Sequence, residues 1–369
     1  MNLSDNIKDK KLRVIAEKVS NSIPMDEADA MEMLTTNNIL DLGMIAGFIK
    51  QQLHGNNVFY GVNMNLNYTN ICELRCPLCA FSKGQGEEGS YTLSLNEIEQ
   101  RVSDAVAAGI DEVHIVGGLN PELKLPYFEE MLARIKRIRP DIFIVAFTAV
   151  EYDYFARLNN LTIEAVFKRL INAGVNALPG GGAEIFAQGV RDIIAPKKIS
   201  GKRWLDIMET AHRLGLKTNA TMLYNHLEKP ADIVDHLFQI RLLQEKTGGF
   251  KAFVPLAFHK DNTAISTSRA SAATGYNDIR IYAASRIVLH NIPHIKALWM
   301  YLGEKMAQTM LCFGADEMGA TYNNEKVVHA AGAKTSDSGS EDFLKRLIMD
   351  AGMIPVRTTA GYNMHGGNT

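Results

Sequence analysis

The chain has 369 residues, of which 46% are hydrophobic and 22% charged, and its formal net charge is -2 at pH 7. A chain of this length can bury a large core as one domain with appendages, and a charge near zero gives no sign of a nucleic-acid partner. The amino terminus is charged and no run of eighteen apolar residues appears, so we expect no membrane partner and a cytoplasmic protein.

Residues 1–54 are predicted to form an amino-terminal helical extension, because apolar residues such as Leu12, Ile15 and Val19 recur at helical spacing. From residue 58 onward, strand-like runs alternate with helical patterns. The strand-like runs cover residues 58–66, 112–116, 142–147, 175–178, 218–223, 252–258 and 295–300. The clearest helical patterns cover residues 95–108, 127–138, 163–173, 204–214 and 231–246.

Repeated strand-helix units predict an α/β fold with a parallel sheet, since parallel strands need a crossover and a helix supplies it. Seven or eight units fit a (β/α)8-type TIM barrel, closed or partly open, over residues 55–335. A doubly wound open sheet is the alternative. Residues 336–369 are predicted to be a carboxy-terminal tail or cap, with a helix over 343–353 and an extended segment at 354–357.

Three of the four cysteines lie close together, with Cys72, Cys76 and Cys79 in a CxxxCxxC pattern that Phe81 follows. Three thiolates can hold three irons of a 4Fe-4S cluster and leave the fourth iron open. The natural occupant of that open iron is S-adenosyl-L-methionine (SAM), whose amino and carboxylate groups can chelate it. The spacing therefore predicts the radical-SAM signature, with the three cysteines as the metal ligands.

Other uses of these cysteines fit less well. A structural zinc site needs a fourth ligand, and no histidine lies between His54 and His114. A disulfide framework needs an oxidising compartment and more cysteines. The fourth cysteine, Cys312, lies in an apolar stretch, where it is expected to be a buried small hydrophobe.

Barrel active sites form where strands end and loops begin, and unusual residues collect at those junctions here. After the second predicted strand come Gly117 and Gly118, whose bare backbone can approach the ammonium of SAM; a tight turn is the alternative. Glu184 follows a triple glycine and can accept hydrogen bonds from a ribose, or it can sit in the first turn of a helix. Arg191 is a candidate clamp for the methionine carboxylate, or a partner in a surface pair.

Two histidines, His226 and His259, are predicted at the ends of the fifth and sixth strands, facing the same rim. A structural role is the alternative for either one. With the cysteine loop and the glycine segments, they place all the candidate chemistry at one end of the barrel.

Several segments together resemble the radical-SAM menaquinone-biosynthesis family, whose members are similar in plan to the deazaflavin-cofactor synthases. The segments are the cysteine region at 67–81, the Pro-Gly-Gly-Gly-Ala-Glu block within 178–186, and residues 218–224, 247–250 and 255–263. The likeness spans nearly all of residues 55–335. One departure is Leu119, which stands where many radical-SAM enzymes have an acidic residue after the two glycines.

The resemblance implies a transferase of the futalosine route to menaquinone that forms a carbon–carbon bond. In the members most similar to this chain, a 5'-deoxyadenosyl radical adds to 3-[(1-carboxyvinyl)oxy]benzoate. Rearrangement and decarboxylation then give 6-amino-6-deoxyfutalosine, which retains the adenosyl group. Two alternatives stay open: the cyclising sibling that forms cyclic dehypoxanthine futalosine after abstracting hydrogen, and a non-catalytic iron-sulfur sensor.

The resemblance also implies roles for single residues. Phe81 is expected near the adenine, and Asn219, Thr221 and Thr263 are expected near the two carboxylates of the substrate. His226 is expected there too, and His259 is the first candidate for proton transfer, since imidazole changes charge near neutral pH. An electron donor such as flavodoxin or ferredoxin is the implied partner.

Overall fold

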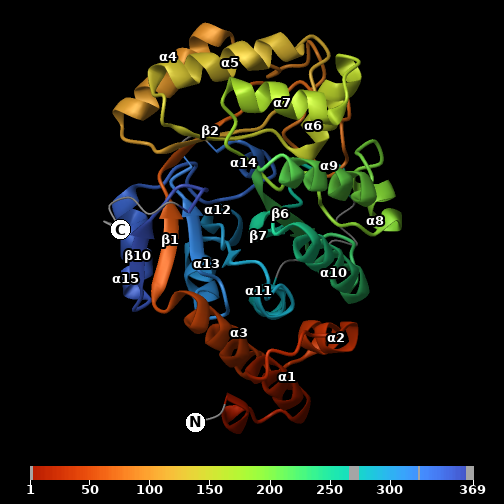
Figure 1. Ribbon diagram of the computed structural model, residues 1–369, viewed down its shortest axis with the longest axis vertical. Coiled ribbons are helices and arrows are strands. Elements are labelled where there is room, and N and C mark those ends of the chain that lie inside the picture. Colours follow the sequence, from red (N-terminus) through yellow and green to blue (C-terminus); the bar gives the residue numbers. More distant parts are fainter. Residues whose placement is uncertain (1–2, 266–273, 323–324, 363–369) are drawn as a thin grey trace.

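The computed structural model describes residues 3–265, 274–322 and 325–362. The chain starts with a short 3-10 helix, η1 (Leu3–Asn6), and three α-helices at one end of the molecule, and α4 to α7 lie at the opposite end (Figure 1). The first three helices are α1 (Lys10–Ser20), α2 (Glu27–Thr35) and α3 (Ile39–His54). None of the described helices is long and apolar enough to cross a membrane.

The amino-terminal helices are attached to the rest of the fold by helix packing and by two arginines. Helices α2 and α3 pack on α11, and α2 also packs on α10. The guanidinium of Arg241 on α10 donates to the carbonyl oxygen of Met25 at 2.8 Å, and Arg280 on α11 donates to that of Thr36 at 2.6 Å. Each of these carbonyls lies at an end of α2, so the two arginines fix that helix on the barrel.

Seven strands form one parallel sheet in the order β2-β3-β4-β5-β6-β7-β8. This sheet curls into a half-barrel, so the predicted α/β barrel-type fold is confirmed. The strands are β2 (Asn63–Leu66), β3 (Glu112–Ile115), β4 (Phe143–Ala146), β5 (Ala177–Leu178), β6 (Lys217–Tyr224), β7 (Phe250–Ala257) and β8 (His294–Ile295).

Helices between the strands cover the outside of the sheet. They are α4 (Leu95–Ala107), α5 (Leu125–Ile138), α6 (Ala149–Leu158), α7 (Ile163–Ala173), α8 (Gln188–Ile194), α9 (Gly201–Arg213), α10 (Pro230–Thr247) and α11 (Gly275–Val288). The carboxy-terminal part adds α12 (Trp299–Leu302), α13 (Glu304–Met310), α14 (Val327–Ala330) and α15 (Glu341–Asp350).

A second parallel sheet has the order β10-β1-β9. Its strands are β1 (Asn57–Gly61), β9 (Glu317–Ala320) and β10 (Ile354–Arg357). The two sheets meet where Lys296, just after β8, forms a bridge with Glu317, and where the amide of Ala297 donates to the carbonyl of Glu317 at 2.7 Å. The strands of the second sheet therefore continue the curl of the first.

The predicted strand over 58–66 is two strands, β1 and β2, that belong to different sheets. Buried apolar side chains recur at every second position through Val58, Tyr60, Val62, Met64 and Leu66. This apolar spacing shows which side chains are buried but not which strand lies alongside, so the sequence pattern could not show where the partner changes. The run predicted at 295–300 is also shorter than expected, because the chain turns into α12 at its end.

The segment after β10 closes the end of the barrel where the strands begin. The amide of Ala360 donates to Glu112 at 2.6 Å, and the ammonium of Lys251 donates to the carbonyl oxygen of Ala360. The hydroxyl of Tyr362 donates to Glu317 at 2.5 Å. The cysteine loop follows β2 at the opposite end. The division of the chain at residues 54 and 335 into separate domains stays a prediction.

Candidate active site

The cysteine loop lies directly after β2, with Cys76 buried and Cys72 and Cys79 partly exposed. The amide of Cys79 donates to the carbonyl of Cys76 at 2.9 Å, and the amide of Cys72 donates to the carbonyl of Lys83 at 3.0 Å. Burial raises the pKa of Cys76 to about 11, and the nearby thiols of Cys79 and Cys72 act in the same direction. The three sulfurs are thus close enough to influence one another.

Gly117 and Gly118, in the loop after β3, pack closely against the start of the cysteine loop. An ideal Cβ on Gly118 would collide with the carbonyl of Ile71, and one on Gly117 would collide with the ring of Tyr68. The amide of Gly118 donates to Thr69 at 2.9 Å. The two glycines therefore let the next loop pack against the cysteine loop, and their predicted contact with SAM stays a prediction.

A cavity of about 340 Å³ runs through the barrel from the cysteine loop to the carboxy-terminal segment. Cys79 lines one end, and Thr358, Thr359 and Ala360 line the other. Three free thiols on one loop, with one of them facing a cavity, fit a 4Fe-4S cluster whose open iron faces the interior. Soft thiolates are the donors that such clusters prefer.

The structure brings some of the predicted site residues together and leaves others apart. The predicted residues that line the cavity are Cys79, Glu184, Asn219, Thr221 and His259. Those that do not line it are Cys72, Cys76, Phe81, Gly117, Gly118, Arg191, His226 and Thr263.

Glu184 forms an ion pair with Lys198, at 2.5 Å between Oε1 and Nζ. Burial alone would raise the pKa of Glu184, but Lys198 and Arg191 outweigh it and hold this pKa below its usual range. The pKa of Lys198 is raised: burial opposes the rise, and Glu184, Cys76 and Cys79 together more than offset burial. Glu184 also has a positive φ of 49°, a costly conformation for a residue with a side chain. A charged pair is thus held in a strained loop facing the cavity.

The guanidinium of Arg191 is buried and is directed at backbone carbonyls. It donates to Ile185 at 3.0 Å and also to Ala183 and, at 2.5 Å, to Ile199. These bonds tie the glycine-rich loop after β5 to the segment that follows α8. The predicted clamp on the SAM carboxylate stays a prediction, and the geometry gives Arg191 a positioning role first.

Of three other predicted residues, His226 and Thr263 have their polar atoms bonded to nearby backbone, and Phe81 lines a second, adjoining pocket. The imidazole of His226 donates from Nε2 to Leu223 at 2.9 Å, and its Nδ1 accepts from an amide at 2.7 Å. The hydroxyl of Thr263 donates to Lys260 at 2.8 Å. Phe81 lines a second pocket, beside Tyr91. Their predicted roles stay predictions.

His259, Thr221 and Asn219 face the cavity in different ways. The Nε2 of His259 is 2.9 Å from the carbonyl oxygen of Tyr301, and donation to that oxygen leaves Nδ1 as the acceptor. Thr221 donates to the carbonyl of Gly180 at 2.7 Å. The Oδ1 of Asn219 is buried and has no hydrogen-bond partner among the described residues. An unpaired buried acceptor at a cavity is a natural contact for a ligand donor.

Sequence reasoning missed several polar residues of the cavity. They are Asn63, Asn65, Asn67, Glu112, His114, Lys198, Lys296 and Glu317. A signal existed for the first three, since polar Asn63, Asn65 and Asn67 alternate with buried Met64 and Leu66 along one strand. Residues at this spacing share one face of a strand, which here is the interior. No such signal existed for the lysines, because the fold alone brings them to the site.

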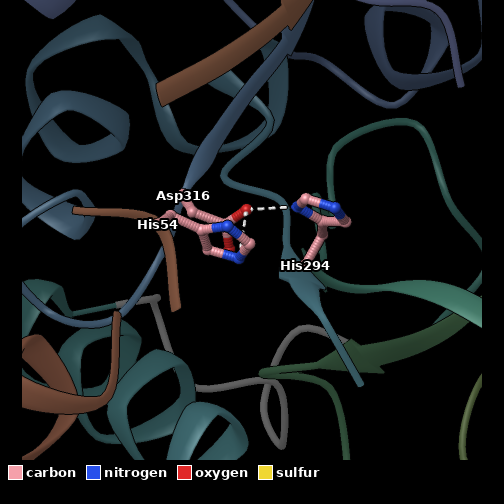
Figure 2. A group of neighbouring side chains, drawn as sticks. All are labelled: His54, His294 and Asp316. Carbon is pink, nitrogen blue, oxygen red and sulfur yellow. Dashed lines mark hydrogen bonds and ion pairs between the residues drawn. The ribbon is translucent and has the colours of Figure 1, made fainter. Parts of the chain in front are cut away.

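One further group in the described part of the chain has the donors of a metal site: His54, His294 and Asp316 (Figure 2). Asp316 already accepts from His294 at 2.6 Å and from the amide of Ile295 at 2.8 Å. It also pairs with the buried guanidinium of Arg286. A guanidinium on the same carboxylate would repel a metal cation. This group is therefore a structural network at the end of the barrel where β8 and β9 begin.

The expectation that Cys312 is a buried small hydrophobe is wrong. Cys312 is exposed, just after α13, and it does not line the cavity. The apolar neighbours Met310 and Leu311 are buried, whereas Cys312 points outward where the helix has ended. The apolar run in the sequence could not show which of its members faces solvent.

Comparison with known proteins gives two family matches, the radical SAM superfamily over residues 66–240 and the CofH/MqnC C-terminal region over residues 247–367. The chain is 36% identical to an aminodeoxyfutalosine synthase of Thermus thermophilus, over 96% of each chain. It is 34% identical to a 5-amino-6-(D-ribitylamino)uracil–L-tyrosine 4-hydroxyphenyl transferase of Methanothermobacter thermautotrophicus, over 97% of this chain and 98% of that one.

A solved structure supports the fold. The FeFe-hydrogenase maturase HydG of Carboxydothermus hydrogenoformans superposes with a TM-score of 0.75 at 17% identity. The superposition covers 98% of this chain and 82% of that one. At this identity the likeness concerns the architecture of the barrel and carries no statement on substrate.

Proposed function

The chain belongs to the radical SAM superfamily, in the group with the CofH/MqnC C-terminal region, and we propose that it is an aminodeoxyfutalosine synthase. The observation that carries the proposal is the near full-length similarity to the Thermus thermophilus enzyme of that name. The proposed reaction joins the adenosyl group of SAM to 3-[(1-carboxyvinyl)oxy]benzoate, followed by rearrangement and decarboxylation to 6-amino-6-deoxyfutalosine. The overall class is a carbon–carbon bond-forming transferase of menaquinone biosynthesis.

The cofactors are a 4Fe-4S cluster, held by Cys72, Cys76 and Cys79, and SAM as a co-substrate. When bound, they supply an adenosyl radical by reductive cleavage of SAM. An electron-transfer protein such as flavodoxin or ferredoxin is proposed as the source of the electron. All other steps depend on how the residues of the chain surround the cavity.

The cavity suits chemistry that must be kept from water. Apolar side chains such as Val145, Leu256 and Met300 line its walls, and the carboxy-terminal segment closes its far end. A closed apolar container protects a reactive species from water and stray hydrogen donors. His259, whose imidazole is fixed through Tyr301, is proposed to hold or transfer a proton beside the substrate.

The test is anaerobic incubation of the reconstituted protein with SAM, a reductant and 3-[(1-carboxyvinyl)oxy]benzoate. We expect the adenosyl carbon to be captured in the product, without an equal amount of free 5'-deoxyadenosine. Cys79→Ala should abolish product formation. Cys312→Ala is the matched control, since Cys312 is exposed outside the cavity, and it should retain activity.

Three other outcomes would overturn the proposal. Free 5'-deoxyadenosine together with a cyclised product would show the hydrogen-abstracting sibling. Turnover of L-tyrosine with 5-amino-6-(D-ribitylamino)uracil, the pair named by the Methanothermobacter thermautotrophicus relative, would show the other transferase. Failure to cleave SAM with any of these substrates would leave an iron-sulfur binding protein.

A further inference from the structure

The pairing of β2 with β3 gives the depth of several polar groups in the cavity. Asn67 follows β2 next to the cysteine loop, and Asn65 lies two residues earlier, roughly 6–7 Å deeper along the strand. Asn65 is the register partner of His114 on β3, and Asn63 at the start of β2 is that of Glu112. His114 therefore lies at a middle level and Glu112 at the floor.

Three asparagines of the cavity present acceptors. The Oδ1 atoms of Asn65, Asn67 and Asn219 are buried and lack a hydrogen-bond partner among the described residues. Asn67 already donates from its amide nitrogen to the carbonyl of Val116 at 3.1 Å, which fixes its oxygen as the open atom. Acceptors of this kind suit ribose hydroxyls or an ammonium group, and they repel a carboxylate.

Lys296 and His114 present donors to the same cavity. The ammonium of Lys296 has three N–H groups and uses one on Glu317, with 2.6 Å between Nζ and Oε1. Within the described part of the chain, the imidazole of His114 makes no hydrogen bond, and it lines the cavity. Burial lowers the pKa of His114 to about 4, with Lys296 and Lys251 adding to the effect. The ring is thus neutral and can donate one N–H.

The carboxylates at the floor of the cavity accept hydrogen bonds from the carboxy-terminal segment. Tyr362 donates to the second oxygen of Glu317 at 2.5 Å, and its ring stacks on His294 with 3.6 Å between ring centroids. His294 is in turn held by Asp316 (Figure 2). Glu112 accepts from the amide of Ala360 at 2.6 Å. The carboxy-terminal segment therefore holds Glu317 in place, so that Lys296 is positioned and has donors to spare.

We propose that Lys296 and His114 form a carboxylate subsite that receives the ring carboxylate of the substrate. The inference rests on the proposed function, which supplies a substrate with two carboxylates. The double bond that reacts must face the cysteine end, since the adenosyl group is delivered there. The ring carboxylate is then the remote end of the molecule. Lys296 lies toward that end because it pairs with Glu317, which Tyr362 also contacts, and His114 lies two residues above Glu112 on β3. Val145, Leu256 and Leu298 line the cavity and suit the aromatic ring.

The experiment compares two substrates, the natural one and its analogue without the ring carboxylate, 2-phenoxyacrylate. Wild-type holoenzyme should prefer the natural substrate by about 100-fold in kcat/KM, because a buried donor pair is left without its anion in the analogue. Calorimetric titration of each compound into the holoenzyme under anaerobic conditions should show a loss of affinity in the same direction.

Variants then test which residues cause the preference for the substrate with the ring carboxylate. Lys296→Met alone would leave the buried carboxylate of Glu317 without its cation, so the double variant Lys296→Met/Glu317→Gln is used instead, which removes both charges. The double variant and His114→Leu should each reduce the substrate preference to a few-fold, with little change for the analogue. His114→Asn keeps an N–H donor and should retain part of the preference. Lys246→Met, which breaks an exposed ion pair between Lys246 on α10 and Glu209 on α9, is the control and should keep the wild-type ratio.

The outcomes distinguish a wrong subsite from a wrong proposed function. If the wild type turns over the natural substrate but uses the analogue equally well, the subsite is wrong and the proposed function stands. If the variants lower activity on both compounds by the same factor, Lys296 and His114 are structural and the subsite is again wrong. If the wild type makes no product from the natural substrate yet cleaves SAM with another, the proposed function itself fails.

Discussion

The backbone of Gly118 lies against the carbonyl oxygen of Ile71, so closely that no Cβ fits between them. Ile71 is the residue before the first cysteine of the loop, and the amide of Gly118 is bonded to Thr69 at 2.9 Å. The contact therefore sets how near the loop after β3 can come to the loop that carries the three thiols.

Gly118→Ala should push these two loops apart and lower the iron bound per chain to well under half of the wild-type value. The displaced atom would be backbone, which cannot move aside as the end of a side chain can. Iron and sulfide analysis after anaerobic reconstitution measures the effect. Gly189→Ala is the matched control, because a Cβ at Gly189 meets nothing within 4 Å. Equal iron content in the two variants would contradict the prediction.

Arg191→Lys should lower the free energy of unfolding by about 2 kcal/mol, because a lysine cannot serve all the buried carbonyls that the guanidinium reaches. Anaerobic denaturant unfolding measures this loss. If Arg191 instead acts as the predicted clamp on the SAM carboxylate, the variant would keep its stability and lose affinity for SAM. The two measurements together decide between a positioning role and a binding role.

Asn219→Leu should leave the fold as stable as the wild type or more so, while kcat/KM falls at least about 10-fold. The buried Oδ1 of Asn219 has no partner among the described residues, so its removal costs the folded protein no hydrogen bond. Thermal unfolding and steady-state kinetics give the two readouts. A variant that is both less stable and unchanged in turnover would show that Asn219 serves the fold alone.

His212 should make the protein less stable in mild acid. Its Nδ1 is 2.8 Å from Thr247 and its Nε2 is 2.8 Å from Thr218, and burial lowers its pKa to about 4. The unfolded chain takes up a proton near pH 6.5, which the folded chain resists down to pH 4, so stability is lost as the pH falls through this window.

The predicted cost from His212 is about 1.3 kcal/mol between pH 7.5 and 5.5. Anaerobic denaturant unfolding gives the free energy of unfolding at each pH. The loss of this free energy from pH 7.5 to 5.5 should be smaller in His212→Gln than in the wild type by this amount. Each protein is compared with itself, so a general loss of stability in the variant does not affect the result. The same pH difference in both proteins would contradict the lowered pKa.

Much of the fold could be predicted because its signals are local. The pattern over 163–173 predicted α7 with its observed bounds, and the run at 354–357 predicted β10. Strand β9 (Glu317–Ala320) was missed, since four residues that include a glycine carry too little periodicity. Helix α6 was also missed, although Thr148 and Glu151 form a capping box at its start.

The sequence by itself determined the cysteine motif, the repeated strand-helix units and hence the kind of barrel and the end at which the chemistry lies. These follow from spacing along the chain and from the rule that parallel strands end at one rim. Only the tertiary structure decided that His226 bonds to its own turn while His114 faces the cavity. Only the tertiary structure, too, placed Lys296 beside Glu317 over a floor made by the carboxy-terminal segment. Residues so far apart in the sequence meet through packing, which no local pattern records.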